Sequence, residues 1–298
     1  MVKVNLRKSE SKKKARKTKA KALVLTLPTE FNIPSQTLSD YSILIYGAKK
    51  IGKTALAARF PDVFIMSLEP GTKALRTKAR RVPDWDHFVG YVDLLEAGGH
   101  GYKTVVVDTM DLAYKYALQK VCAADMIEHP SENNDFGKTW DRIKEMLYTQ
   151  VMRLIDLDMG VIFLSHDKEK EVELRDGRTI DRIQPTMANG AMEVVSALVD
   201  IIANYAYIDD ERILFLDGSQ AMFGGCRCEE NFIRKGGKAA TAGDRITSVS
   251  MGKSSRESYD NLLTAFKNKQ IKTSALQDEN APSLKKKKKI TLKKKSSK

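Results

Sequence analysis

The stretch SILIYGAKKIGKT, residues 42–54, decides the fold that we expect of this chain. Its first five residues, Ser42–Tyr46, form an almost continuous apolar run, which predicts a buried strand. The next eight match the pattern G-x-x-x-x-G-K-[ST] and lead into a helical stretch, Lys53–Phe60, that stops at Pro61. Strand, glycine-containing loop and helix in this order predict a phosphate-binding loop.

Each key position of this loop has a chemical reason. Gly47 and Gly52 permit backbone conformations in which successive N–H groups face phosphate oxygens. Lys53 is expected to reach the β- and γ-phosphates, and the Thr54 hydroxyl to ligate Mg²⁺. We therefore predict ATP and Mg²⁺ as cofactors, with the nucleotide held by Gly47, Ala48, Lys49, Lys50, Ile51, Gly52, Lys53 and Thr54. Lys49 and Lys50 either add charge near the phosphates or point to solvent, and we favour solvent.

Short apolar runs recur along the chain and alternate with longer helical patterns. The further strands that we expect are Val63–Ser67, Thr104–Asp108, Val161–Ser165, Val199–Ala206 and Arg212–Leu216. The further helices are Trp85–Ala97, capped by Asp84, then Asp111–Met126 and Thr139–Leu157. Strand and helix alternating in this way predict the α/β class, with a doubly wound, mostly parallel sheet.

Three carboxylates are candidates for the second half of the site. Asp108 ends the run TVVVD, which is the Walker B arrangement, so we expect it to hold the metal together with Thr54. Glu69 follows the next strand after the loop, where a carboxylate can orient a water in line with the γ-phosphate. Asp111 is the alternative base, and a plain turn residue is the alternative role for Glu69.

Two cationic or titratable side chains complete the set of candidates. His166 follows the run VIFLS and either contacts the γ-phosphate or makes only a local hydrogen bond. Arg227 lies in the segment GGCRC, where an arginine could act as a finger across a subunit boundary. Arg234, Lys235 and Arg245 compete for that role, and spacing alone does not separate them.

The positive charge of the chain is concentrated at its two ends. The whole chain carries a net charge of +13, yet residues 1–21 hold ten lysines and arginines against one glutamate, and residues 272–298 hold ten lysines against two acids. Both segments lack the apolar residues that would offset the entropy of ordering. We expect disordered basic tails at residues 1–21 and 271–298 around a globular P-loop body at residues 22–270.

The remaining composition argues for a cytoplasmic protein. The three cysteines suggest reduced thiols rather than a disulfide framework. No run of 18 apolar residues occurs, and the basic N-terminus lacks the apolar stretch of a secretory signal. We therefore expect no membrane span, and a host-cell cytoplasm if a phage encodes the protein.

Taken in order, seven segments resemble the RecA-like phage NTPases, a family that includes single-strand-annealing ATPases of phage recombination systems. They are LIYGAKKIGKTAL, FIMSLEPG, TVVVDTMD, NDFGKTWDRI, GVIFLSHDKE, IQPTM and GGCRC, and they span about residues 40–230. The resemblance implies a RecA-like P-loop NTPase core that hydrolyses ATP, assembles into rings or filaments and works on single-stranded DNA. It also implies a water-activating role for Glu69, a γ-phosphate sensor in His166 and a trans-acting role for Arg227. The basic pair Lys49-Lys50 departs from the family, whose members usually carry smaller residues there.

Single-stranded DNA is therefore the partner that we expect, with a single-strand-binding protein as a further candidate. The tails can bind phosphates without sequence preference, or act only as solubilising or localisation segments. The segment Glu169–Gln184 contains the hairpin signal Asp176-Gly177, and its arginines either touch phosphates or face solvent; these are Arg175, Arg178 and Arg182. Two other functions stay open, a P-loop small-molecule kinase and a non-hydrolysing scaffold whose assembly ATP controls.

Overall fold

The computed structural model describes residues 27–234 and 244–269. Residues 27–33 belong to a unit of their own and contain no regular element. Every helix and strand described below lies in the unit that begins at Pro34. The tails predicted at residues 1–21 and 271–298 lie outside the described residues, as does Lys235, so those expectations and the domain boundaries stay predictions.

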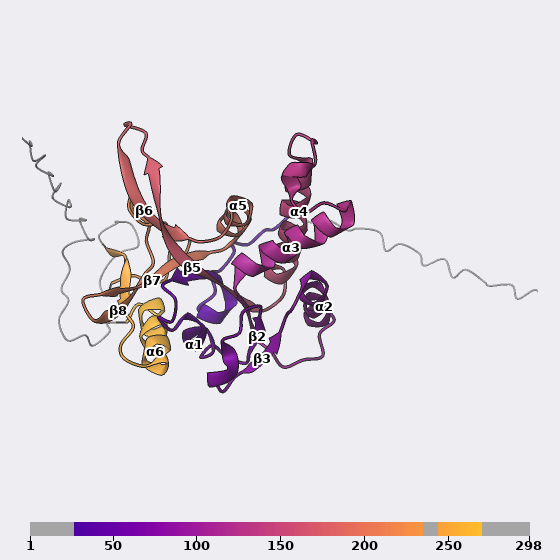
Figure 1. The fold of residues 1–298 in the computed structure, drawn as a ribbon. Coiled ribbons are helices and arrows are strands. Elements are labelled where there is room, and N and C mark those ends of the chain that lie inside the picture. Colours follow the sequence, from indigo (N-terminus) through magenta and orange to yellow (C-terminus); the bar gives the residue numbers. More distant parts are fainter. Residues whose placement is uncertain (1–26, 235–243, 270–298) are drawn as a thin grey trace, which may run out of the picture. The chain divides into compact units, whose positions relative to one another are not determined.

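One mixed sheet forms the centre of the fold (Figure 1). In the described residues its strands are β1 (Ser42–Gly47), β2 (Val63–Ser67), β3 (Lys78–Arg81), β4 (Thr104–Asp108), β5 (Gly160–Glu173), β6 (Thr179–Pro185), β7 (Ile201–Ile208), β8 (Glu211–Phe215), β9 (Gly225–Cys226) and β10 (Ser248–Ser250). The order across the sheet is β10-β8-β7-β1-β5-β4-β2-β3, while β6 pairs with β5 and β9 with β7. The strands from β7 to β3 in this order run parallel to one another, whereas β6, β8, β9 and β10 pair antiparallel; this confirms the predicted mostly parallel α/β sheet.

Helices cover both faces of this sheet, as the doubly wound prediction requires. In the described residues they are α1 (Lys53–Ala57), α2 (Trp85–Glu96), α3 (Met110–Asp125), α4 (Lys138–Ile155), α5 (Asn189–Leu198) and α6 (Ser255–Phe266). Side chains alternate along each strand, so Leu44 and Phe163 face α2 to α5 while Ile43 and Ile162 face α1 and α6. Two apolar cores result, one on each side of the sheet.

The strand order decides which residues can meet at the phosphate-binding loop. β5 lies between β1, which leads into the loop, and β4, which ends in Asp108. β1, β2, β4 and β5 are parallel, so their carboxyl ends point to the same edge of the sheet. Ligands of open α/β sheets bind at this edge. The fold therefore brings the ends of four strands to one place.

Several elements differ from the sequence predictions. Helix α1 ends at Ala57, three residues earlier than expected, and the strand predicted at Val161–Ser165 is only the inner part of the 14-residue β5. β5 continues outward and turns at Asp176-Gly177 into β6, which forms the predicted hairpin (Figure 1). The Asp84 cap of α2 is confirmed, since its carboxylate accepts the N–H of His87 at 2.9 Å.

All three cysteines, Cys122, Cys226 and Cys228, are free thiols in the structure. Among the helices of the described residues, none combines the length and the apolar character needed to cross a membrane.

Candidate functional site

The loop between β1 and α1 is shaped by close contact with the neighbouring strand β7. A β-carbon on Gly47 would lie 2.0 Å from the carbonyl oxygen of Tyr205, so only glycine fits there. Gly52 has φ +113° and Lys50 has φ 65°, which puts both in the left-handed region as the chain curls back to start α1. The side chains of Lys49 and Lys50 are exposed.

Lys53 is buried and folded back onto the loop. Its Nζ donates to the carbonyl oxygens of Gly47 at 2.7 Å and Ala48 at 3.0 Å. Burial lowers the pKa of the Lys53 ammonium, and nearby carboxylates, Asp167 and Asp108 foremost, oppose that shift. A cation held at the mouth of the loop can stabilise the charge of a bound phosphate.

Thr54 and Asp108 lie next to each other, as a shared metal site requires. The Thr54 hydroxyl donates to Asp108 Oδ2 at 2.8 Å, and Asp108 is buried at the end of β4. Burial raises the pKa of the Asp108 carboxyl, while the hydrogen bond from Thr54 lowers it. A hydroxyl and a carboxylate side by side are oxygen ligands of the kind that Mg²⁺ prefers, so the pair fits this ion.

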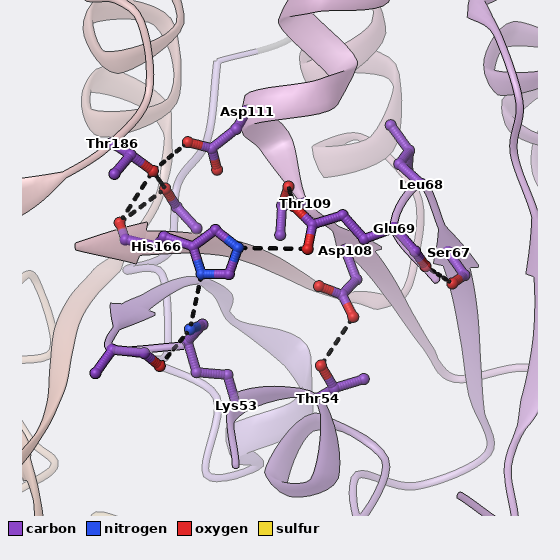
Figure 2. A network of polar contacts seen from close by, with 12 residues as sticks. Lys53, Thr54, Ser67, Leu68, Glu69, Asp108, Thr109, Asp111, His166 and Thr186 are labelled. Atoms are coloured by element: carbon purple, nitrogen blue, oxygen red, sulfur yellow. Dashed lines mark hydrogen bonds and ion pairs between the residues drawn. The ribbon is translucent and has the colours of Figure 1, made fainter. Parts of the chain in front are cut away.

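Glu69 is held between Thr109 and His166 (Figure 2). Its Oε1 accepts the Thr109 hydroxyl at 3.0 Å, and its Oε2 lies 3.3 Å from His166 Nε2. The other ring nitrogen, His166 Nδ1, lies 3.4 Å from Lys53 Nζ. Because the ammonium can only donate, these partners assign the tautomer in which Nδ1 accepts and Nε2 donates to Glu69.

The structure therefore brings five of the predicted site residues together. Lys53 and Thr54 begin α1, Glu69 follows β2, Asp108 ends β4 and His166 lies on β5 beside Gly47. The backbone strengthens the arrangement, since the N–H groups of Leu68 and Glu69 both donate to the Asp108 carbonyl. The peptide bond between Asp108 and Thr109 is cis.

Asp111, the alternative base, makes a different contact. Its Oδ1 accepts the hydroxyl of Thr186, and the Thr186 N–H donates to the His166 carbonyl at 2.9 Å (Figure 2). Asp111 thus ties the residue after β6 to the start of α3, whereas Glu69 contacts the imidazole that touches Lys53. Sequence reasoning missed Thr109 and Thr186. The position of Thr109 directly after the Walker B aspartate was the available signal.

Arg227 does not join this cluster. β9 pairs with the first two residues of β7, at the edge of the sheet opposite the loop, and Arg227 follows it. Its guanidinium is exposed and donates to the Ala197 carbonyl at 2.6 Å. Its competitor Arg245 donates to the carbonyls of Cys226 and Cys228. The role of Arg227 in a neighbouring subunit's site stays a prediction, because the structure contains a single chain.

The β5–β6 hairpin sorts its charges between two faces. The register pairs Lys170 with Arg182 on one face and Glu171 with Asp181 on the other. The first face also carries Lys168, whereas the second also carries the exposed acids Glu169 and Glu173. Like charges opposite each other destabilise a hairpin. An anionic ligand bound to the basic face would reduce this electrostatic repulsion.

The fold and the site define a class, the P-loop NTPases: a G-x-x-x-x-G-K-T loop follows a central strand, and a buried aspartate, Asp108, ends a second strand. A family model described as "AAA domain" matches residues 39–228, and the chain belongs to that family. This confirms the P-loop NTPase part of the resemblance. The RecA-like annealing type stays a prediction.

A curated relative is the "SPbeta prophage-derived uncharacterized protein YorG" of Bacillus subtilis (strain 168). It is 26% identical over 145 residues, which are 47% of this chain and 45% of the relative. The chain thus matches less than half the length of that relative.

Proposed function

We propose that this protein is a RecA-like phage ATPase that binds and hydrolyses ATP while acting on single-stranded DNA in recombination or strand annealing. The observation that carries the proposal is the contact chain from Lys53 through His166 to Glu69, beside the Thr54–Asp108 pair. Hydrolysis of a terminal phosphate needs a cation that binds the phosphate, ligands for a metal ion and a carboxylate that can activate water, and these three groups lie together here. The match to a prophage-derived protein supports a phage origin.

In the proposed reaction a water oxygen attacks the γ-phosphorus, and the bond to the β–γ bridging oxygen breaks. Glu69 orients the water and takes its proton, while Lys53 exchanges the loop carbonyls for phosphate oxygens. Thr54 and Asp108 would hold Mg²⁺, which when bound neutralises charge on the phosphate oxygens. His166 contacts both Glu69 and Lys53, and so holds the two side chains in position relative to each other.

The hairpin is the proposed DNA contact. Its basic face, Lys168, Lys170 and Arg182, can neutralise phosphates, and its acidic face would set the side on which DNA lies. Both of its strands adjoin the site, because His166 lies on β5 just before the hairpin and Thr186 directly follows β6. DNA that shifts the hairpin would therefore shift His166 and Glu69, and this predicts DNA-stimulated hydrolysis.

Phosphate release from ATP, measured with and without single-stranded DNA, tests the function. We expect turnover that DNA increases and that Lys53→Ala abolishes. A failure of DNA to stimulate turnover, together with no shift of DNA in a gel at low salt, would refute the DNA-directed function. Transfer of the phosphate to an added nucleoside instead of water would favour the kinase alternative.

Two neighbouring hairpin variants test the DNA contact with a matched control. Lys170 and Glu171 are both exposed but lie on opposite faces. Lys170→Ala should weaken DNA binding and lower the salt dependence of the affinity by about one phosphate contact. Glu171→Ala, which removes an acid from the other face, should leave binding unchanged or stronger. Equal losses in both variants would argue against a one-sided contact.

The remaining parts of the proposal concern assembly and location. We propose a homo-oligomeric ring or filament in the host-cell cytoplasm. Arg227 lies at the edge of the sheet opposite its own loop, so a finger role for this arginine would need a second subunit. A single-strand-binding protein is a further proposed partner. Light scattering with ATP and DNA, compared for wild type and Arg227→Ala, distinguishes assembly from a monomer.

A further inference from the structure

The strand order fixes which way a nucleotide must run across the edge of the sheet. The residues around the expected γ-phosphate, Glu69, Asp108 and His166, lie on or after β2, β4 and β5, all on one side of β1. β7 and β8 lie on the other side of β1. A nucleotide whose terminal phosphate meets Lys53 and Glu69 therefore extends its ribose and base toward β7 and β8.

Two side chains stand at that position, Tyr207 on β7 and Arg212 on β8. They are cross-strand partners in the register, so they share a face of the sheet. By alternation this is the face of Tyr205 and Leu214, which pack in the core on the side of α1. Gly47 pairs with Tyr205, so Tyr207 lies two residues beyond the start of the phosphate-binding loop.

Arg212 is anchored against the loop. Its Nε and Nη2 donate to the Gly252 carbonyl at 3.2 and 3.0 Å. Its Nη1 points to the other side and lies 3.4 Å from where a β-carbon on Gly52 would sit. One side of the guanidinium is therefore held by the Gly252 carbonyl, and the other side lies next to Gly52, the residue that precedes Lys53.

Tyr207, in contrast, is largely in solvent, with 57% of the residue exposed. No ring pair involving Tyr207 occurs among the described residues. An aromatic ring that stays in solvent beside a fixed guanidinium suits stacking on a flat ligand, since bases stack on both kinds of plane.

We propose that Tyr207 and Arg212 form the nucleobase-binding part of the site, with the base stacked on the Tyr207 ring and bordered by the Arg212 guanidinium. This inference rests on the proposed ATP binding at Gly47–Thr54 and adds to it a residue pair that favours nucleoside triphosphates over bare polyphosphate. The ligand class is a nucleoside triphosphate with an aromatic base.

Calorimetric binding of two ligands to the full-length chain separates the base from the phosphates. ATP carries both parts, whereas inorganic tripolyphosphate carries only the phosphates. Tyr207→Ala should weaken ATP binding about tenfold, a typical loss for one stacking ring, and leave tripolyphosphate binding unchanged. Tyr207→Phe, which keeps the ring, should bind ATP as the wild type does. Tyr148→Ala, at a tyrosine 40% exposed on α4, is the matched surface control and should bind both ligands normally.

The outcomes distinguish failure of the proposed base contact from failure of the proposed ATP site. Unchanged ATP affinity in Tyr207→Ala would overturn the base contact while leaving the ATP site in place. Parallel losses of ATP and tripolyphosphate would also overturn it, since they would mean that the variant damages the loop. If wild-type protein bound neither ligand, or if Lys53→Ala bound ATP as well as wild type does, the proposed ATP site itself would fail.

Discussion

Replacing Glu69 with glutamine separates ATP binding from ATP hydrolysis in this protein. The two side chains have the same length, so the Thr109 hydroxyl, now 3.0 Å from Oε1, can still donate to the amide oxygen. The amide cannot take a proton from water at neutral pH. The contact with His166 Nε2 is weakened, because the donating nitrogen now meets an amide that also carries hydrogens.

The expected size of the effect follows from these contacts. Loss of a general base lowers a rate by about 10²- to 10⁴-fold. Glu69 contacts His166 and Thr109 and makes no direct bond to Lys53 in the structure, so ATP affinity should change by no more than a few fold. The Glu69 side chain is 34% exposed, so the fold should keep nearly its full stability.

Single-turnover hydrolysis and equilibrium ATP binding would be measured on the same preparation. Glu145→Gln is the matched control, since Glu145 is an exposed carboxylate on α4, far along the chain from the site. A hydrolysis rate in Glu69→Gln within threefold of wild type would refute the general-base role of Glu69 and favour Asp111 as the base. Equal losses of binding and hydrolysis would mean that Glu69 shapes the site rather than activating water.

Three further changes test separate parts of the account. Thr54→Val leaves the buried Asp108 carboxylate without its hydroxyl donor, so Mg²⁺-dependent ATP affinity should fall at least about tenfold, while Thr54→Ser keeps it; calorimetry with Mg²⁺ and with EDTA reads this out. In Gly160→Ala a β-carbon would lie 1.9 Å from the Ser39 carbonyl oxygen, so unfolding free energy should fall by about 1–3 kcal/mol, and a denaturation midpoint equal to that of wild type would contradict the packing. Arg227→Ala mixed with Lys53→Ala should recover part of the activity that each lacks alone, if the arginine acts across a subunit boundary, and turnover that stays at the level of the separate variants would exclude that role.

The sequence predicted most of the parallel core, because that information is local. Buried parallel strands are apolar along their whole length, and the runs at Ser42–Tyr46 and Thr104–Asp108 are of this kind. β3 was missed because Lys78–Arg81 is charged and largely exposed, which is typical of a strand at a sheet edge. The sequence predicted the inner part of β5 as a strand and its outer part only as a hairpin-like segment, because the outer residues alternate in charge and have no apolar face.

The candidate site was predictable to the extent that strand ends signal it. Glu69, Asp108 and His166 each follow an apolar run, and parallel strands bring such ends together. Thr109 has only its position directly after Asp108 as a signal, and Thr186 has none, because a hydroxyl is a site residue only through the partners that the fold gives it. Tyr207 and Arg212 depend on strand order, which local patterns do not contain. Arg227 was selected from a resemblance, and the described chain leaves it at the opposite edge of the sheet.

The most direct test of the central claim is a structure of the protein with a non-hydrolysable ATP analogue, Mg²⁺ and single-stranded DNA. We predict the γ-phosphate at Lys53, with Nζ released from the Gly47 carbonyl, and the Glu69 carboxylate within reach of a water in line with that phosphate. A nucleotide bound in the opposite direction, with its base beside Glu69 and its terminal phosphate toward β8, would contradict it.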